Sequence, residues 1–197
     1  MRFVLTMTAQ LGRNHLAYLR KNLRAARAKV KSPLGELSVA LVNDRTMSEL
    51  HREFMKQRGP TDVLTFPLGL DARGMAVAGE IVICVPQAQR RAKIEHTSTK
   101  HELLLYAIHG LLHLAGYDDR TARGFQIMHQ LEDKILTGLG VGPVFQKPDS
   151  LPRYAGGGQG RGLTNAPRRS KPSPEASPRL LGEGEKRVHV SSTRRRA

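Results

Sequence analysis

The sequence of 197 residues lacks several features that whole classes of protein require. It contains no tryptophan and a single cysteine, Cys84, which excludes an internal disulfide framework and a zinc site built from several cysteines. No run approaches the ~18–20 apolar residues that a membrane-spanning helix needs, and the first residues do not read as a signal peptide. These absences predict a cytoplasmic protein with no membrane-spanning segment.

Negative charge is also scarce. Lys and Arg number 32 against 17 Asp and Glu, so the formal net charge is +15. A balance this basic indicates a polyanionic partner, either nucleic acid or an anionic membrane surface.

The composition changes near residue 146. Residues 147–197 hold 12 Lys and Arg, 4 Asp and Glu, 6 of the 11 prolines and the run Gly156-Gly157-Gly158. Such a segment buries too little apolar surface to offset its chain entropy. We therefore expect one folded domain in residues 1–146 and a disordered basic C-terminal tail in residues 147–197. The tail either binds phosphate groups or is a solvated extension without a role.

Strand and helix patterns alternate along residues 1–146. Strands are expected at residues 2–7, 36–42, 62–68 and 79–85. Helices are expected at residues 14–30, 47–55, from Pro86 onward, 100–115 and 122–136. The order β-α-β-α-β-β-α-α-α predicts an α+β domain with one mixed four-stranded sheet packed by about five helices.

The helix expected at residues 100–115 carries a candidate metal site. His109 and His113 are four residues apart, so their side chains differ by only about 40° around a helix and lie one turn apart. Gly116 then ends the helix and lets the chain turn back toward them with Asp119. Two imidazoles and one carboxylate, with an open fourth position, are typical of a catalytic zinc site. We therefore expect one Zn²⁺ ion on His109, His113 and Asp119.

Two other interpretations of this pattern remain open. Histidines four residues apart can simply face solvent or cap a neighbouring element, and the Gly break with its following carboxylate argues against that. The spacing also resembles that of metalloproteases, which place a glutamate after the first histidine as general base. That position is Gly110 here, so proteolysis is the weaker hypothesis for an enzymatic activity.

Three separated motifs together resemble one known family. Residues 109–119, HGLLHLAGYDD, resemble the signature HGxLHLxGYDH of the YbeY family of bacterial endoribonucleases, which are rRNA maturation factors. Residues 60–67, PTDVLTFP, are similar to its PTDVLSFP strand, and residues 79–84, GEIVIC, to its GDIVIS strand. Met128 and Glu132 fit its terminal M-x-x-x-E helix. The resemblance covers roughly residues 1–140.

The sequence departs from the family pattern at two positions. The last histidine of the family signature, its third zinc ligand, is Asp119 here, and aspartate is also a competent zinc ligand. The family has an arginine, thought to meet the RNA backbone, where this sequence has Met55. We expect the nearby cations Arg52, Lys56 and Arg58 to bind RNA in its place.

The resemblance implies a zinc-dependent, single-strand-specific endoribonuclease that hydrolyses RNA phosphodiester bonds through a water activated on His109 and His113. It further implies action on 16S rRNA in ribosome biogenesis, with small-subunit ribosomal proteins and an assembly GTPase as partners. A second hypothesis is an RNA-binding assembly factor with a structural zinc site and little or no nuclease activity. No cluster of Tyr or Phe indicates a surface for stacking RNA bases, so only slight sequence preference is expected.

Overall fold

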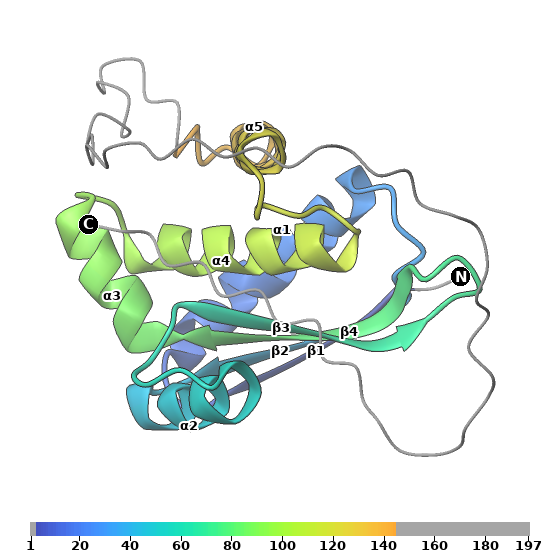
Figure 1. The fold of residues 1–197 in the computed structure, drawn as a ribbon. Helices are drawn as coiled ribbons and strands as arrows, with labels where there is room; N and C mark the ends of the chain where they lie inside the picture. Colours follow the sequence, from blue (N-terminus) through green and yellow to red (C-terminus); the bar gives the residue numbers. More distant parts are fainter. Residues whose placement is uncertain (1–2, 145–197) are drawn as a thin grey trace, which may run out of the picture. The chain divides into compact units, whose positions relative to one another are not determined.

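The computed structural model describes residues 3–144, so the prediction for the C-terminal tail lies outside the described residues. Within this range the elements follow the expected order (Figure 1). They are β1 (Val4–Ala9), the short 3-10 helix η1 (Arg13–His15), α1 (Leu16–Lys29), β2 (Glu36–Val42), α2 (Asp44–Met55), β3 (Val63–Leu70), β4 (Ala76–Cys84), α3 (Val85–Ile94), α4 (Thr99–Leu114) and α5 (Ala122–Gly138).

The four described strands form one mixed sheet in the order β1-β2-β4-β3. Strand β2 pairs in parallel with both β1 and β4, so that Val39 lies beside Met7 on one side and Ile81 on the other. Strand β3 runs antiparallel to β4 at the edge, where Pro67, which has no N–H to donate, is tolerated. The predicted α+β fold with a mixed four-stranded sheet is confirmed.

Alternation along the strands gives the sheet two buried faces. In β4, Ile81 and Ile83 join the larger apolar cluster with α1, α3, α4 and α5, whereas Val82 and Cys84 join a smaller cluster with α2. Helices α1, α3 and α4 thus cover one face, with α5 outside α4, and α2 covers the other face (Figure 1). Cys84 is fully buried, as expected for a core residue.

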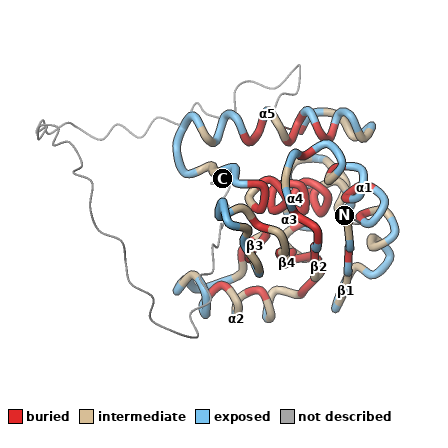
Figure 2. The backbone as a smooth tube through the Cα atoms, turned by 90° about the vertical axis from the view of Figure 1, so that its right-hand side faces the viewer, coloured by how far each residue is buried: buried red, intermediate tan, exposed pale blue. Residues whose placement is uncertain are grey.

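Helix α4 is the centre of the larger layer. Almost all of its residues are buried, as the continuous red stretch in Figure 2 shows. Gly110 lies where α4 packs tightly against the sheet, because a Cβ atom there would lie 2.8 Å from Thr65 Oγ1 and 2.9 Å from Ile81 Cδ1. The sheet thereby fixes the rotation of α4 and decides which way its histidines point.

The start of α2 differs from the sequence-based prediction. Helix α2 begins at Asp44, three residues before the predicted start, because Asn43 Oδ1 accepts a hydrogen bond from Thr46 N at 2.9 Å and caps the first turn.

Among the helices of residues 3–144, none is both long and apolar enough to cross a membrane.

Candidate metal centre

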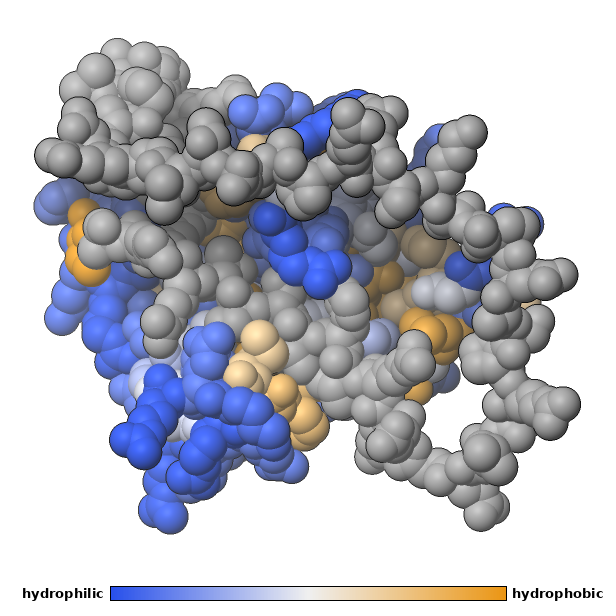
Figure 3. Space-filling model, in the orientation of Figure 1, coloured by the Kyte–Doolittle hydropathy of each residue, from blue (hydrophilic) through white to orange (hydrophobic). Residues whose placement is uncertain are grey.

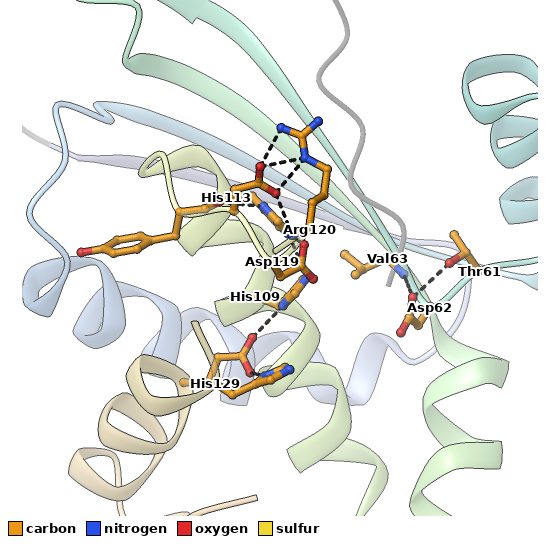
Figure 4. A network of polar contacts seen from close by, with 11 residues as sticks. Thr61, Asp62, Val63, His109, His113, Asp119, Arg120 and His129 are labelled. Carbon is orange, nitrogen blue, oxygen red and sulfur yellow. Dashed lines mark hydrogen bonds and ion pairs between the residues drawn. The ribbon is translucent and has the colours of Figure 1, made fainter. Parts of the chain in front are cut away.

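The two histidines of α4 meet a carboxylate from the following loop. His109 Nε2 and His113 Nε2 lie 3.0 Å apart. Asp119 Oδ2 lies 3.8 Å from His109 Nε2, and Asp119 Oδ1 lies 3.8 Å from His113 Nε2 (Figure 4). The three donor atoms all lie within 4.8 Å of one another, and they form the group of residues within 3–144 that could hold a metal ion.

Gly116 brings Asp119 back to the helix. Its φ of 90° is in the left-handed region that favours glycine, and Tyr117 N donates to Leu112 O, which closes the end of α4. The neighbouring Asp118 instead pairs with Arg120, with Oδ2 2.6 Å from Nη2. The loop therefore directs Asp119, and not Asp118, toward the histidines.

The second nitrogen of each imidazole is held by an acceptor. His113 Nδ1 donates to the carbonyl oxygen of Tyr117 at 3.0 Å, and His109 Nδ1 donates to Glu132 Oε1 at 2.6 Å. A ring nitrogen that donates carries the proton of the neutral imidazole, so the lone pair is left on Nε2. Both Nε2 lone pairs consequently point at the same small region of space.

One positive charge fits between these two nitrogens. Burial, followed by the charge of His109, lowers the pKa of His113 to about 4. Burial alone would lower the pKa of His109 too, but its hydrogen bond to Glu132 and the nearby carboxylates raise it. In the absence of a metal, a proton on His109 can bridge the pair. A metal ion can take the place of that proton.

The spacing of the donors fits such an ion. Two nitrogens that each bind one tetrahedral zinc at about 2.05 Å lie roughly 3.3 Å apart, close to the 3.0 Å observed here. Asp119 lies farther out, with a carboxylate oxygen 3.8 Å from each nitrogen, and would need to move closer to share the same ion. The residues present therefore suit a metal ion with two imidazole ligands and one carboxylate ligand.

Glu132 is the functional residue whose role sequence reasoning missed. This fully buried carboxylate of α5 joins His109 to His129, whose Nδ1 lies 2.6 Å from Glu132 Oε2. Burial alone would raise the pKa of Glu132, yet the two histidine hydrogen bonds lower it to about 2, so the group stays ionised. The sequence singled out Glu132 only for its place in a motif. A carboxylate behind a metal-binding histidine orients the ring and strengthens the ligand.

The loop before β3 also faces the centre. Asp62 Oδ1 accepts hydrogen bonds from Val63 N at 2.9 Å and from Thr61 Oγ1 at 3.0 Å, as expected for a cap at the strand start (Figure 4). Burial raises the pKa of Asp62, and its charge acts on His109. Asp62 thus adds negative potential beside the candidate metal ligands.

The predicted RNA-binding cations lie apart from the histidines. Arg52 is in the last turn of α2, Lys56 caps that helix, and Arg58 follows in the loop. Arg52 and Arg58 line a cavity of about 450 Å³. Figure 3 shows hydrophilic side chains gathered over α2. Helix α2, which carries Arg52, covers the opposite face of the sheet from α4, which carries His109 and His113.

Gly110 bears on the metalloprotease alternative. A side chain at this position would point at Thr65 and Ile81 of the sheet, away from open space. The glutamate that a protease of the related pattern uses as general base therefore has no room there. The packing of α4 argues against proteolysis independently of the sequence motif.

Comparison with known proteins identifies the family. A family model described as "Endoribonuclease YbeY" matches residues 7–140. The chain belongs to the YbeY family. The predicted resemblance is thereby confirmed.

Several relatives named "Endoribonuclease YbeY" match the chain. That of Acidothermus cellulolyticus is 38% identical over 116 residues, covering 53% of this chain and 71% of the relative. That of Thermobifida fusca is 39% identical over 113 residues, covering 54% and 73%. That of Moorella thermoacetica is 37% identical over 142 residues, covering 66% and 90%. The solution structure of TM1509 from Thermotoga maritima is 28% identical and covers 77% of this chain and 99% of its own, with a TM-score of 0.47.

Proposed function

We propose that this YbeY-family chain is a zinc-dependent, single-strand-specific endoribonuclease that takes part in the maturation of small-subunit rRNA. The family is one of endoribonucleases, so the chain is an enzyme that hydrolyses RNA. The observation that carries the proposal is the convergence of His109, His113 and Asp119 on one point, with the histidine tautomers fixed by partners behind them.

The site residues divide the chemical work among them. His109, His113 and Asp119 would hold the zinc ion, and Glu132 keeps His109 oriented with its Nε2 free to bind. Zinc, when bound, makes coordinated water acidic enough to attack at neutral pH and offers positive charge to a phosphoryl oxygen. Three protein ligands leave the fourth position of a tetrahedral site open.

The positive charge of the chain would hold the RNA backbone. We propose Arg52, Lys56 and Arg58 as phosphate contacts, supported by the cavity that Arg52 and Arg58 line together. We also propose that residues 1–146 form the enzyme domain and that residues 147–197 form a basic tail, which adds contacts to phosphate groups. Small-subunit ribosomal proteins and an assembly GTPase are proposed as partners from the family resemblance alone. A cytoplasmic site of action is proposed from the single cysteine and the lack of a long apolar segment.

A second candidate function is RNA binding in ribosome assembly with little catalysis. The observation that favours it is Met55, which replaces the family's arginine and packs against the apolar cluster under α2. A thioether cannot pair with phosphate, so this position offers no charge to the RNA.

The experiment compares the wild-type protein with His113→Ala and with Asp118→Asn as a control. We expect the wild-type protein to hold one zinc ion and to cleave single-stranded small-subunit rRNA fragments. His113→Ala should lose both properties, and Asp118→Asn should keep both. Undiminished zinc in His113→Ala would exclude this ligand set. Zinc-loaded wild-type protein that binds RNA without cleaving it would favour the second candidate.

A further inference from the structure

Two aromatic side chains are exposed beside the candidate metal centre. Among residues 3–144, the exposed aromatic residues are Phe54, Tyr117 and Phe125, each with 37–39% of its surface accessible. Phe54 packs edge-to-face against Phe66 under α2, with ring centroids 4.9 Å apart. The other two belong to residues near the candidate ligands, because Tyr117 precedes Asp119 by two positions and the ring of Phe125 contacts His129.

Tyr117 is tied to a histidine of the centre, and Phe125 to a histidine behind it. The carbonyl oxygen of Tyr117 accepts the hydrogen bond from His113 Nδ1. The ring of Phe125 lies edge-to-face with His129, at a centroid distance of 3.9 Å. His129 in turn shares Glu132 with His109. The backbone of Tyr117 and the ring of Phe125 are therefore fixed relative to the two proposed ligands of α4.

The loop and helix that carry the two rings are packed closely together. A Cβ atom at Gly124 would overlap the carbonyl oxygen of Asp118, so the first turn of α5 lies directly against the loop. This loop supplies both Tyr117 and Asp119, and Phe125 follows Gly124 in the chain. The two aromatic residues are eight positions apart in the sequence, which is why no aromatic cluster is visible before the chain is folded.

Two exposed cations lie between the two aromatic residues in the sequence. Arg120 and Arg123 are both exposed, and Arg120 is paired with Asp118 on the same loop. Aromatic side chains alternating with positive charges suit single-stranded nucleic acid, because the rings stack on bases while the cations follow the backbone. A protein partner would be expected to need a larger and less charged apolar surface.

We infer that Tyr117 and Phe125 are stacking surfaces for unpaired RNA bases next to the metal centre. This inference rests on the proposed action of the site on RNA. Bases in a duplex are already stacked and paired, so only a single strand can present its base faces to these rings. Because every base has such a face, the two residues select single-stranded RNA with little preference for its sequence.

The test measures the affinity of the full-length, metal-loaded protein for a 12-nucleotide single-stranded RNA by fluorescence anisotropy, before cleavage begins. The variants are Tyr117→Leu and Phe125→Leu, which keep an apolar side chain but remove the flat ring. Matched controls are Tyr117→Phe, Phe125→Tyr and Phe54→Leu. A 12-nucleotide sugar–phosphate chain without bases serves as the second probe, because it keeps the charge and removes the stacking partner.

We expect each leucine variant to bind the single-stranded RNA about 5- to 150-fold more weakly than the wild-type protein. The controls should match the wild-type protein, all variants should bind the base-free chain equally, and their zinc content should be unchanged. Wild-type affinity of both leucine variants for the RNA would overturn the inference, as would an equal loss of affinity for the base-free chain. If the wild-type protein cleaves no RNA while the leucine variants still lose base-dependent binding, the proposed function fails and the stacking role stands.

Discussion

Replacing Glu132 with glutamine tests whether the buried carboxylate supports the metal centre. In the native chain its two oxygens each accept a 2.6 Å hydrogen bond, one from His109 and one from His129. Glutamine has nearly the same shape, but only one of its two terminal atoms can accept and neither carries charge. One histidine must then lose its acceptor, and His109 loses the anion that fixes its tautomer.

We expect Glu132→Gln to weaken zinc binding by about 10- to 100-fold, the usual effect of removing a partner behind a metal ligand. This corresponds to roughly 1.4–2.7 kcal/mol of binding free energy. Competition with a chromophoric chelator measures the dissociation constant. Thermal unfolding of the metal-free protein, followed in parallel, shows whether the variant keeps its fold.

Asp133→Asn is the matched control for this prediction. Asp133 is the next residue of α5, is also buried, and accepts a hydrogen bond from Val144 N at 2.7 Å, which asparagine can still accept. Both substitutions remove one negative charge from the same turn of helix. If zinc affinity stays within threefold of wild type in Glu132→Gln, or falls equally in Asp133→Asn, our account of the carboxylate is wrong.

Three further predictions concern the ligand loop, the core and the tail. Asp119→His should keep or raise the zinc affinity in the same chelator assay, because imidazole suits zinc at least as well as carboxylate; a large loss would show that the loop cannot place a ring there. Gly110→Ala should lower the free energy of unfolding by roughly 1–2 kcal/mol, since overpacking against the sheet outweighs the gain in helix propensity; a raised melting temperature would refute this. Removing residues 147–197 should flatten the log–log salt dependence of single-stranded RNA binding by roughly two units if three phosphate contacts are lost; an unchanged slope would show that the tail does not touch RNA.

The elements that could be predicted from sequence are those with strong local signals. The apolar run before Gly116 predicted a helix at residues 100–115, and α4 spans Thr99–Leu114. The spacing of His109 and His113 sufficed to place both on one face, because that geometry is internal to a single helix. Asp119 could be predicted because a glycine break places the next few residues near the end of the same helix.

The features that could not be predicted depend on contacts between elements. Glu132 lies 23 residues from His109 in sequence, and only the packing of α5 on α4 brings them together. The same packing gathers Tyr117 and Phe125 around the centre. Arg52 lies on the opposite side of the sheet from α4, and this too could not be predicted from sequence. The alternation along β4 shows that neighbouring residues face opposite sides of the sheet, but it does not show which helix covers each side.

The chain order of the fold has a consequence for how the protein acquires its metal. All four described strands precede α4, so they leave the ribosome before any of the three proposed ligands does. The larger apolar cluster is nevertheless incomplete until α4 covers the sheet, and Glu132 follows only in α5. We therefore expect metal binding to follow the folding of the newly made chain rather than to nucleate it. A cell short of zinc would then accumulate a folded, metal-free protein that can still be loaded later.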